Sequence, residues 1–444
     1  MNKRMMMQVA HTAMVRMGTF VSRLALVFLL GRTFTPTDFG AYALIASTLG
    51  FGVVVLGLNL SAYVYRVVPG QPVEKRVTVF KSALFFEVGL SALLVSVLLF
   101  SGRLKPFLTI FKAVAYEPAF VIGFVTLIAM IAVSEMQHYL LAKIAIHECN
   151  LLDFITQALW VLPLLILWKL GWAVTLQRLL YIQLGGVLVG LVYASCKIEL
   201  REWWQAALDA KVVRDGLLFS VPLIIPLLSY NLQNLADRFL LSYYCSLHDV
   251  GIYSLAYAFF NSLYSVTAVV ILRTPMSYVV EDHNCGNFAQ RDRKLTYALK
   301  GALGIYSLSA GALLIFSAPI LRLMARQDFM ASRGVMPLLA IGWVMLVLAY
   351  PAHYLLMLEN RTSLIMAIDV VGLAAGMGLD VLLIPRYSYY GAAIAAIVNY
   401  TVVAGLKHYF SRSWTSIRLG ELFSLRGESE ILFRYLKRKS LQQT

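Results

Sequence analysis

Two arginines lie inside an apolar stretch near the start of the chain. Arg16 and Arg23 recur at helical spacing within residues 10–31, on the same face as Thr12 and Thr19. At about 1.5 Å per residue, the two guanidinium groups would lie roughly 10.5 Å apart. Because a guanidinium can pair bidentately with clustered anionic oxygens, this polar stripe predicts an anion-binding surface. The alternative for Arg16 is that it extends to the lipid headgroups.

Acidic residues occur in other apolar stretches. Asp369 and Asp380 share a face of the helix predicted over 362–384, with two glycines that permit close approach of a neighbouring helix. Glu87 and Glu135 lie in two further predicted helices. Carboxyl groups inside a membrane are costly and can take up protons or Na⁺, so all four are candidates for ion coupling. For the two aspartates, a buried pair with a neighbouring arginine is the alternative.

The composition places the chain in a membrane. Of 444 residues, 60% are hydrophobic and 14% are charged, well below the roughly 25% charged residues of soluble domains. The net charge of +15 is carried in loops between apolar runs, so it does not indicate a nucleic-acid partner. The four cysteines are widely spaced and form no CxxC pair, which predicts free thiols, no metal site and no cofactor.

Apolar runs of about 20 residues predict twelve membrane-spanning helices. Lys and Arg are concentrated in alternate loops, and this positive-inside bias predicts that both termini lie in the cytoplasm. The predicted spans are 10–31, 39–65, 82–101, 118–139, 152–170, 179–196, 216–236, 250–272, 301–321, 334–358, 362–384 and 387–406.

A short motif recurs in the two halves of the chain. Residues 38–44 and 249–255 both read D-x-G-x-Y-x-L at the start of a predicted span, and each span is followed by an arginine and then a proline. Six spans separate the copies, so the two halves have the same orientation in the membrane. We therefore expect an all-α protein of two six-helix bundles related by a parallel repeat, divided as 1–210 and 211–410. A basic cytoplasmic tail follows at 411–444. The alternative is that the motif is ordinary helix-start chemistry.

These motifs resemble a known family. TPTDFGAYAL at 35–44, VGIYSLAY at 250–257, and LLIP at 382–385 followed by YGAAIA at 390–395 are similar to the Wzx-type polysaccharide flippases. That superfamily also contains the MATE drug exporters and the peptidoglycan-precursor flippases. The resemblance implies transport of undecaprenyl-diphosphate-linked oligosaccharides from the cytoplasmic to the outer leaflet of the bacterial inner membrane, for surface polysaccharide such as O-antigen, capsule or exopolysaccharide. Asp380 departs from the family, where Asn is common.

The resemblance gives the polar residues specific roles. Arg16 and Arg23 would bind the diphosphate of the lipid-linked substrate in a central cavity. Tyr257 and Asn261 lie on a polar aromatic stripe of the span over 250–272, which could stack against its sugars; the alternative is that these tyrosines only fill apolar positions that need a polar tip. Arg66, Arg238 and Arg273 end apolar stretches, where they would either join the cavity or anchor at the membrane surface.

Three other classes of function are considered. A MATE-like exporter of small organic cations, coupled to H⁺ or Na⁺, is the main alternative, although buried arginines would repel a cation. An enzyme is disfavoured because the sequence has no GxxxxGK[ST] loop and no HExxH motif. A scaffold for assembly is the third class, with the basic tail binding lipid or a partner. A polysaccharide polymerase and chain-length machinery are the expected protein partners, alongside membrane lipids.

Overall fold

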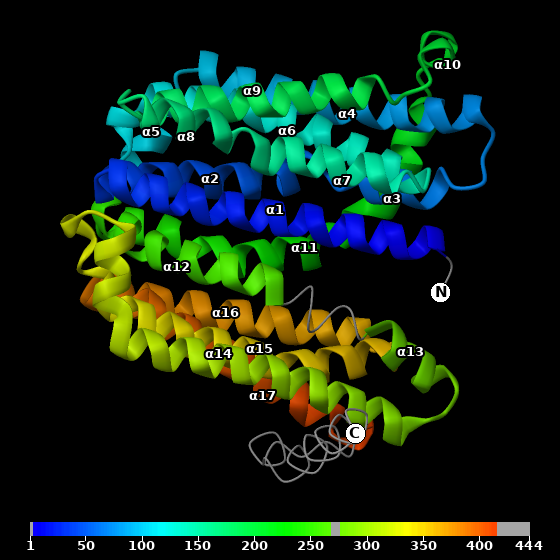
Figure 1. Ribbon diagram of the computed structural model, residues 1–444. Helices are drawn as coiled ribbons and strands as arrows, with labels where there is room; N and C mark the ends of the chain where they lie inside the picture. Colours follow the sequence, from blue (N-terminus) through cyan, green and yellow to red (C-terminus); the bar gives the residue numbers. More distant parts are fainter. Residues whose placement is uncertain (1–2, 268–275, 415–444) are drawn as a thin grey trace, which may run out of the picture.

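The chain is a bundle of long helices in its computed structural model, which describes residues 3–267 and 276–414 (Figure 1). Within these residues every element is helical, as predicted. The elements are α1 (Lys3–Thr33), α2 (Pro36–Leu56), α3 (Leu60–Val67), α4 (Val73–Phe100), α5 (Leu104–Ile110), α6 (Glu117–Ala142), α7 (Ile146–Phe154), α8 (Val161–Lys169), α9 (Leu176–Ser195), α10 (Leu200–Gln205), α11 (Ala210–Tyr244), α12 (Leu247–Thr267), α13 (Met276–Asn284), α14 (Phe288–Met324), α15 (Ser332–Leu358), α16 (Thr362–Tyr387) and α17 (Tyr389–Ser411), with short 3-10 or π turns between some of them.

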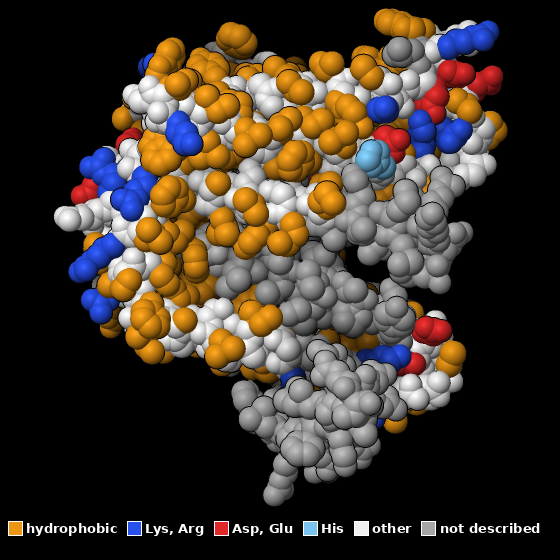
Figure 2. Space-filling view, in the orientation of Figure 1, with side chains coloured by type: hydrophobic (Ala, Val, Ile, Leu, Met, Phe, Trp, Pro, Cys, Tyr) orange, Lys and Arg blue, Asp and Glu red, His pale blue; other side chains and the backbone are white. Residues whose placement is uncertain are grey.

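The predicted spans correspond to the long helices. Ten stretches of the described residues are long and apolar enough to cross a membrane; the last, Thr362–Ser411, contains both α16 and α17, and α12 is not among them. Figure 2 shows hydrophobic side chains across the middle of the visible face, with Lys, Arg, Asp and Glu gathered toward its two ends. This is the distribution expected of a protein that crosses the hydrocarbon of a bilayer. The chain is therefore a multi-pass membrane protein.

Several helices differ in length or continuity from the predicted spans. The predicted span 39–65 is wrong as a single helix, because α2 ends at Leu56 and α3 begins only at Leu60. Leu58 and Asn59, between them, have positive φ angles of 49° and 55°, which no α-helix accommodates. In contrast, α11 and α14 extend well beyond the apolar runs because their charged ends continue the helix into the polar layers.

The two copies of the repeated motif adopt the same local structure. The Thr35 hydroxyl accepts a hydrogen bond from the Asp38 backbone N–H at the start of α2, at 3.2 Å. Ser246 and Asp249 make the equivalent 3.2 Å bond at the start of α12. These are N-caps, which satisfy backbone donors at the first turn of a helix. The motif is thus helix-start chemistry, as the alternative proposed. The same chemistry occurs at the equivalent helix of each half, as the repeat predicts.

The glycines of the two motifs lie where the bundles touch. A Cβ on Gly40 would collide with the backbone carbonyl of Leu247, and a Cβ on Gly251 would collide with that of Pro36. Only glycine permits backbones to cross this closely. Figure 1 shows α1–α9 in one bundle and α14–α17 in the other, with α11 and α12 between these groups on the second half's side.

Cations of the first bundle bind helix ends of the second at this crossing. The Arg32 side chain donates through Nε to the carbonyl oxygen of Leu323 at 2.9 Å, in the last turn of α14. The Lys112 ammonium donates to the carbonyl oxygens of Tyr244 and Cys245, where α11 ends, at 3.4 and 2.5 Å. The carbonyl end of a helix carries partial negative charge, so a cation is favourable there. We call this region, at which α2 and α12 begin, the closed end; in Figure 1 the bundles separate toward the opposite end, where the N-terminus lies.

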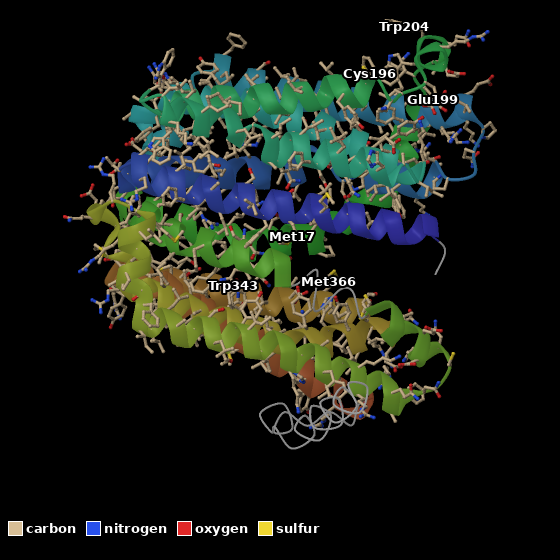
Figure 3. The ribbon with its side chains drawn as sticks, in the orientation of Figure 1. Met17, Cys196, Glu199, Trp204, Trp343 and Met366 are labelled. Atoms are coloured by element: carbon tan, nitrogen blue, oxygen red, sulfur yellow. The ribbon has the colours of Figure 1, made fainter. Side chains whose placement is uncertain are left out.

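The connection between the halves is fastened to the first bundle at that opposite end. Glu199 accepts a hydrogen bond from the Tyr139 hydroxyl at 2.8 Å and pairs with the Lys143 ammonium at 2.6 Å. Lys81 donates to the carbonyl oxygens of Trp203 and Ala206, which terminate α10, at 3.0 and 2.8 Å. In Figure 3, Trp204 lies on α10, and Cys196 and Glu199 lie just before this helix at the same corner of the molecule.

Candidate functional site

A cavity of about 440 Å³ lies inside the first bundle, and we call it the arginine cavity. Arg23 on α1 lines it and donates through Nη2 to the Gln157 side-chain oxygen at 2.8 Å. Gln157 belongs to a π-helical turn between α7 and α8, an irregularity frequent at functional sites. Gln137 and Gln183 also line the cavity, so a charged donor and several carboxamides face the same space.

Arg16 lies about two helical turns before Arg23, on the same side of α1. Its Nη2 is 3.2 Å from Asp153 Oδ2, and its side chain is 48% exposed. Asp153 also accepts hydrogen bonds from the side-chain amides of Gln137 at 2.7 Å and Gln157 at 3.2 Å. One carboxylate therefore stands against two arginines, which leaves an excess of positive charge along this face. The expectation that both arginines share one face is confirmed, and Arg16 pairs within the bundle.

A second cavity, of about 230 Å³, lies between the bundles and is lined by residues of both. It shares Arg23 with the arginine cavity and is also lined by Arg238 and Asn261. Arg238 was expected at the end of a span; it instead lies within α11, which continues to Tyr244, and it is only 7% exposed. Its guanidinium lies 4.3 Å from the centroid of the Tyr257 ring and donates to the Asn234 carbonyl oxygen at 2.7 Å.

A third cavity, of about 320 Å³, lies within the second bundle, and we call it the C-terminal cavity. It shares Asn261 with the cavity between the bundles. Its charged lining residues are Asp369 on α16 and Lys407 on α17, whose Oδ1 and Nζ atoms are 2.7 Å apart. The predicted alternative for Asp369, a structural pair, is thus what the structure shows, with lysine in place of arginine.

Asp380 lies apart from this pair, in a small acidic cluster. It is 8% exposed, and its Oδ1 atom has no hydrogen-bond partner among the described residues. A cavity of about 20 Å³ is lined by Asp380, Asp237 on α11 and Asn399 on α17. That volume is about the space of one water molecule or one small cation. Gly376 allows α17 to approach here, because a Cβ would lie 3.1 Å from the Asn399 amide group.

The remaining predicted site residues lie elsewhere. Arg66 is exposed on α3, with its guanidinium 4.6 Å from the centroid of the Phe219 ring. Glu87 and Glu135 are buried together in the first bundle, and Glu87 accepts a hydrogen bond from the Leu60 backbone N–H at 2.9 Å. Glu87 therefore caps α3 where the helix resumes after its break, and neither glutamate lines the cavities described here. Arg273 lies outside the described residues.

Sequence reasoning did not identify Asp153, Asp237 or Lys407. Asp153 was available as an acid inside a predicted span, but nothing in its own helix indicates that α1 supplies two arginines beside it. Asp237 and Lys407 sit at the predicted ends of spans, where charges are ordinary. No group of three His, Cys, Asp or Glu side chains in residues 3–267 and 276–414 is arranged to hold a metal ion.

Comparison with known structures identifies the fold. The lipid II flippase MurJ, in an inward closed conformation, superposes with a TM-score of 0.76 at 13% identity, covering 97% of this chain and 93% of MurJ. An inward-facing multidrug resistance MATE transporter of the MOP superfamily gives 0.70 at 13% identity, covering 90% and 97% of the two chains. A point mutant of the Vibrio cholerae MATE transporter VcmN gives 0.61 at 14% identity, covering 93% and 98%. The protein therefore has the fold of the MOP-superfamily transporters.

The sequence also identifies a family. Residues 7–274 match the model of the polysaccharide biosynthesis protein family, and the chain belongs to it. No curated protein sequence matches the chain. The resemblance drawn from the short motifs, to the polysaccharide branch of a superfamily that includes MATE and MurJ, is thereby confirmed.

Proposed function

We propose that the protein is a flippase that moves undecaprenyl-diphosphate-linked oligosaccharides from the cytoplasmic to the outer leaflet of the bacterial inner membrane. The observation that carries this proposal is the set of three neighbouring cavities, of which Arg23 borders the first two and Asn261 borders the last two, with an excess of arginine at one side. Membership of the polysaccharide biosynthesis family supports a role in surface polysaccharide assembly, such as O-antigen, capsule or exopolysaccharide.

Arg16 and Arg23 supply the diphosphate contact in this proposal. Arg16 pairs with Asp153, and Arg23 donates to the neighbouring Gln157 side chain. A diphosphate would therefore meet two positive charges against one negative charge. Such a dianionic group pairs well with planar, bidentate donors. Arg238 lies between the bundles and would act on the substrate during its passage, held in place by Tyr257.

Transport by alternating access would follow from the repeat. The closed end is fastened by the Gly40 and Gly251 crossing and by Arg32 and Lys112, and the bundles separate toward the opposite end. We assign the opposite end, with both termini, to the cytoplasm on the distribution of Lys and Arg. Rocking of the bundles 1–210 and 211–410 about this crossing would expose the cavities to the other leaflet. The lipid tail would remain in the bilayer between the bundles, which avoids exposing it to water.

Ion coupling belongs in this proposal to Asp380, with Asp237, which also pairs with Arg238 at 3.8 Å, as the second carboxyl group at the site. Two carboxyl groups and an Asn oxygen around a space of about 20 Å³ suit a proton or one Na⁺. The space is too small for an organic cation, and Arg23 and Arg238 would repel one in the neighbouring cavity. The MATE-like exporter of small organic cations is therefore the second candidate. Asp369 and Glu87 have structural partners, and Glu135 is buried away from the cavities, so all three are weaker candidates for coupling.

In this role the protein transports its substrate and does not change it chemically. Its substrate would be supplied by the enzymes that build the lipid-linked glycan and consumed by a polysaccharide polymerase and chain-length machinery, with membrane lipids as its surroundings. The basic tail after residue 411 would face the cytoplasm.

Mass spectrometry of polyprenyl-diphosphate-linked glycans in a deletion strain tests the proposal. We expect completed lipid-linked units to accumulate and surface polysaccharide to be lost, with rescue by the wild-type chain. A normally expressed Arg16→Ala, Arg23→Ala double variant should fail to rescue, lowering export by about a hundredfold. Removing two exposed arginines elsewhere, as in Arg103→Ala, Arg178→Ala, should rescue fully. Unchanged lipid-linked pools in the deletion strain would refute the flippase assignment.

A further inference from the structure

The C-terminal cavity has the size of a ligand site and lies in the same line of cavities as the proposed diphosphate site. Its volume of about 320 Å³ falls within the range of roughly 300–1,000 Å³ typical of small-molecule pockets. It shares Asn261 with the cavity between the bundles, and that cavity shares Arg23 with the arginine cavity. The C-terminal cavity therefore lies next but one to the arginine cavity, on the side on which the remainder of a substrate held at Arg23 could extend.

The charges that line the C-terminal cavity neutralise each other. Lys407 Nζ is 2.7 Å from Asp369 Oδ1 and 3.3 Å from His353 Nδ1, and the lysine side chain is only 7% exposed. An ion pair of this kind fixes three helices but leaves no net charge to attract a phosphate or an ammonium group. This contrasts with the arginine cavity, and it favours an uncharged ligand.

Three carboxamides are among the uncharged polar groups of the lining. Gln233 and Asn234 come from α11, and Asn261 comes from α12. The Gln233 amide is oriented by a 2.6 Å hydrogen bond from its Nε2 to the Asp369 backbone oxygen. A carboxamide both donates and accepts hydrogen bonds, as does a hydroxyl group. Such a lining matches a ligand that carries many hydroxyl groups.

Aromatic rings form the apolar part of the same lining. The ring centroid of Trp343 is 6.4 Å from that of Tyr400, and the centroid of Tyr350 is 5.9 Å from that of Tyr354. Figure 3 places Trp343 in the second bundle, toward α12 and the first bundle. A sugar ring has an apolar C–H face that packs on aromatic rings and a hydroxyl edge that bonds to amides. The cavity presents both kinds of surface at once.

We infer that the C-terminal cavity binds an uncharged sugar ring of the transported glycan and selects the glycan, while Arg16 and Arg23 select the diphosphate. This inference rests on the proposed function, because it requires a substrate that carries both groups. It divides recognition between the bundles: charge is recognised in the first, and hydroxyl pattern and ring shape are recognised in the second.

Photo-crosslinking of the full-length chain in its own cells tests the inference, and the sugar need not be identified first. Tyr350→p-benzoylphenylalanine places the probe in the C-terminal cavity, and Gln157→p-benzoylphenylalanine places it in the arginine cavity. Thr401→p-benzoylphenylalanine, at an exposed position of α17 outside these cavities, is the matched control. We expect adducts that contain sugar at positions 350 and 157, and none at 401.

The outcomes separate the two proposals. A lipid-linked glycan adduct at 157 with none at 350 would overturn the sugar site and leave the flippase intact, whereas no glycan adduct at either position would count against both. In a second measurement, Gln233→Ala, at a position that lines the C-terminal cavity and neither of the cavities that contain Arg23, should raise the pool of lipid-linked glycan at least threefold and leave binding of sugar-free undecaprenyl diphosphate to the purified protein unchanged. Thr401→Ala should change neither. An equal loss of binding for the sugar-free probe would also overturn the inference.

Discussion

The two bundles begin their second helices with the same motif but distribute charge in opposite ways. In the first bundle, Arg16 and Arg23 face one carboxylate, Asp153. In the second, Lys407 is paired with Asp369 and Arg238 is paired with Asp237, while Asp380 adds a further carboxyl group beside a space of about 20 Å³. The two halves thus share the helix caps and the glycine contact, whereas the cavity lining is basic in the first bundle and neutral to acidic in the second.

The difference shows which features a repeat conserves. The glycine crossing and the helix caps are needed by both halves, because each half forms one side of the same contact. Cavity side chains meet different parts of an asymmetric substrate, so nothing requires them to match. Fold and chemistry are therefore separable in this chain, as they are in other widely used folds.

Among single substitutions, the largest expected effect comes from the feature that the bundles share. Gly251→Ala places a methyl group against the Pro36 carbonyl, so the closed end cannot seal and export should fall at least tenfold. Gly304→Ala in α14 is the control, since nothing lies within 4 Å of its new Cβ. Rescue of surface polysaccharide in a deletion strain reports export, and labelling of single cysteines at the closed end reports its accessibility. Normal export with an unlabelled closed end would contradict the proposed role of the crossing.

The next effect concerns the acidic cluster of the second bundle. Asp380→Asn removes a buried carboxyl group whose Oδ1 has no partner among the described residues, so the fold should be retained. We expect transport into vesicles to lose its dependence on a proton or Na⁺ gradient and to fall several-fold. Asp328→Asn, at an exposed position, should retain both rate and gradient dependence. Gradient-driven transport that survives in Asp380→Asn would place coupling elsewhere.

A third prediction tests the statement that charge in the C-terminal cavity is structural. Asp369→Asn leaves the buried Lys407 ammonium without its carboxylate and should lower the free energy of unfolding by about 2 kcal/mol, less than for a fully buried pair because Asp369 is partly exposed. The double variant Asp369→Asn, Lys407→Gln should recover part of this loss, which a double-mutant cycle measures. Equal stability of the wild-type and Asp369→Asn proteins would show that the pair is not a structural element.

The smallest effect lies outside the membrane, at the connection between the bundles. Burial alone would raise the pKa of Glu199, but hydrogen bonds from Lys143 and Tyr139 outweigh it and hold the pKa below its usual value. A carboxyl group with a lowered pKa stabilises the fold above its ordinary pKa of about 4.3, and this stabilisation is lost as the pH falls through the folded-state pKa. Glu199→Gln should therefore cost about 0.5 kcal/mol at pH 7 and almost nothing near pH 3, measured by thermal unfolding. A cost that does not change with pH would point to packing alone.

Much of the frame could be predicted from the sequence. The apolar runs indicated the long helices, and the duplicated motif indicated two bundles of the same orientation. The break after Leu56 was missed because Leu58 and Asn59 interrupt the helix through backbone angles that leave no gap in the apolar pattern. Arg238 was predicted at the end of a span because the apolar run ends just before it. The helix α11 nevertheless continues through the charged residues to Tyr244.

The candidate site divides in the same way. The sequence by itself determined that Arg16 and Arg23 share a face of α1 and that Asp369 and Asp380 share a face of α16, because helical period is a local property. Tertiary structure alone decided that Arg16 meets Asp153, that Asp369 meets Lys407 and that Asp380 does not share this pairing. Those outcomes depend on how separate helices of the chain pack against one another, and on small residues such as Gly376 that set how closely they approach.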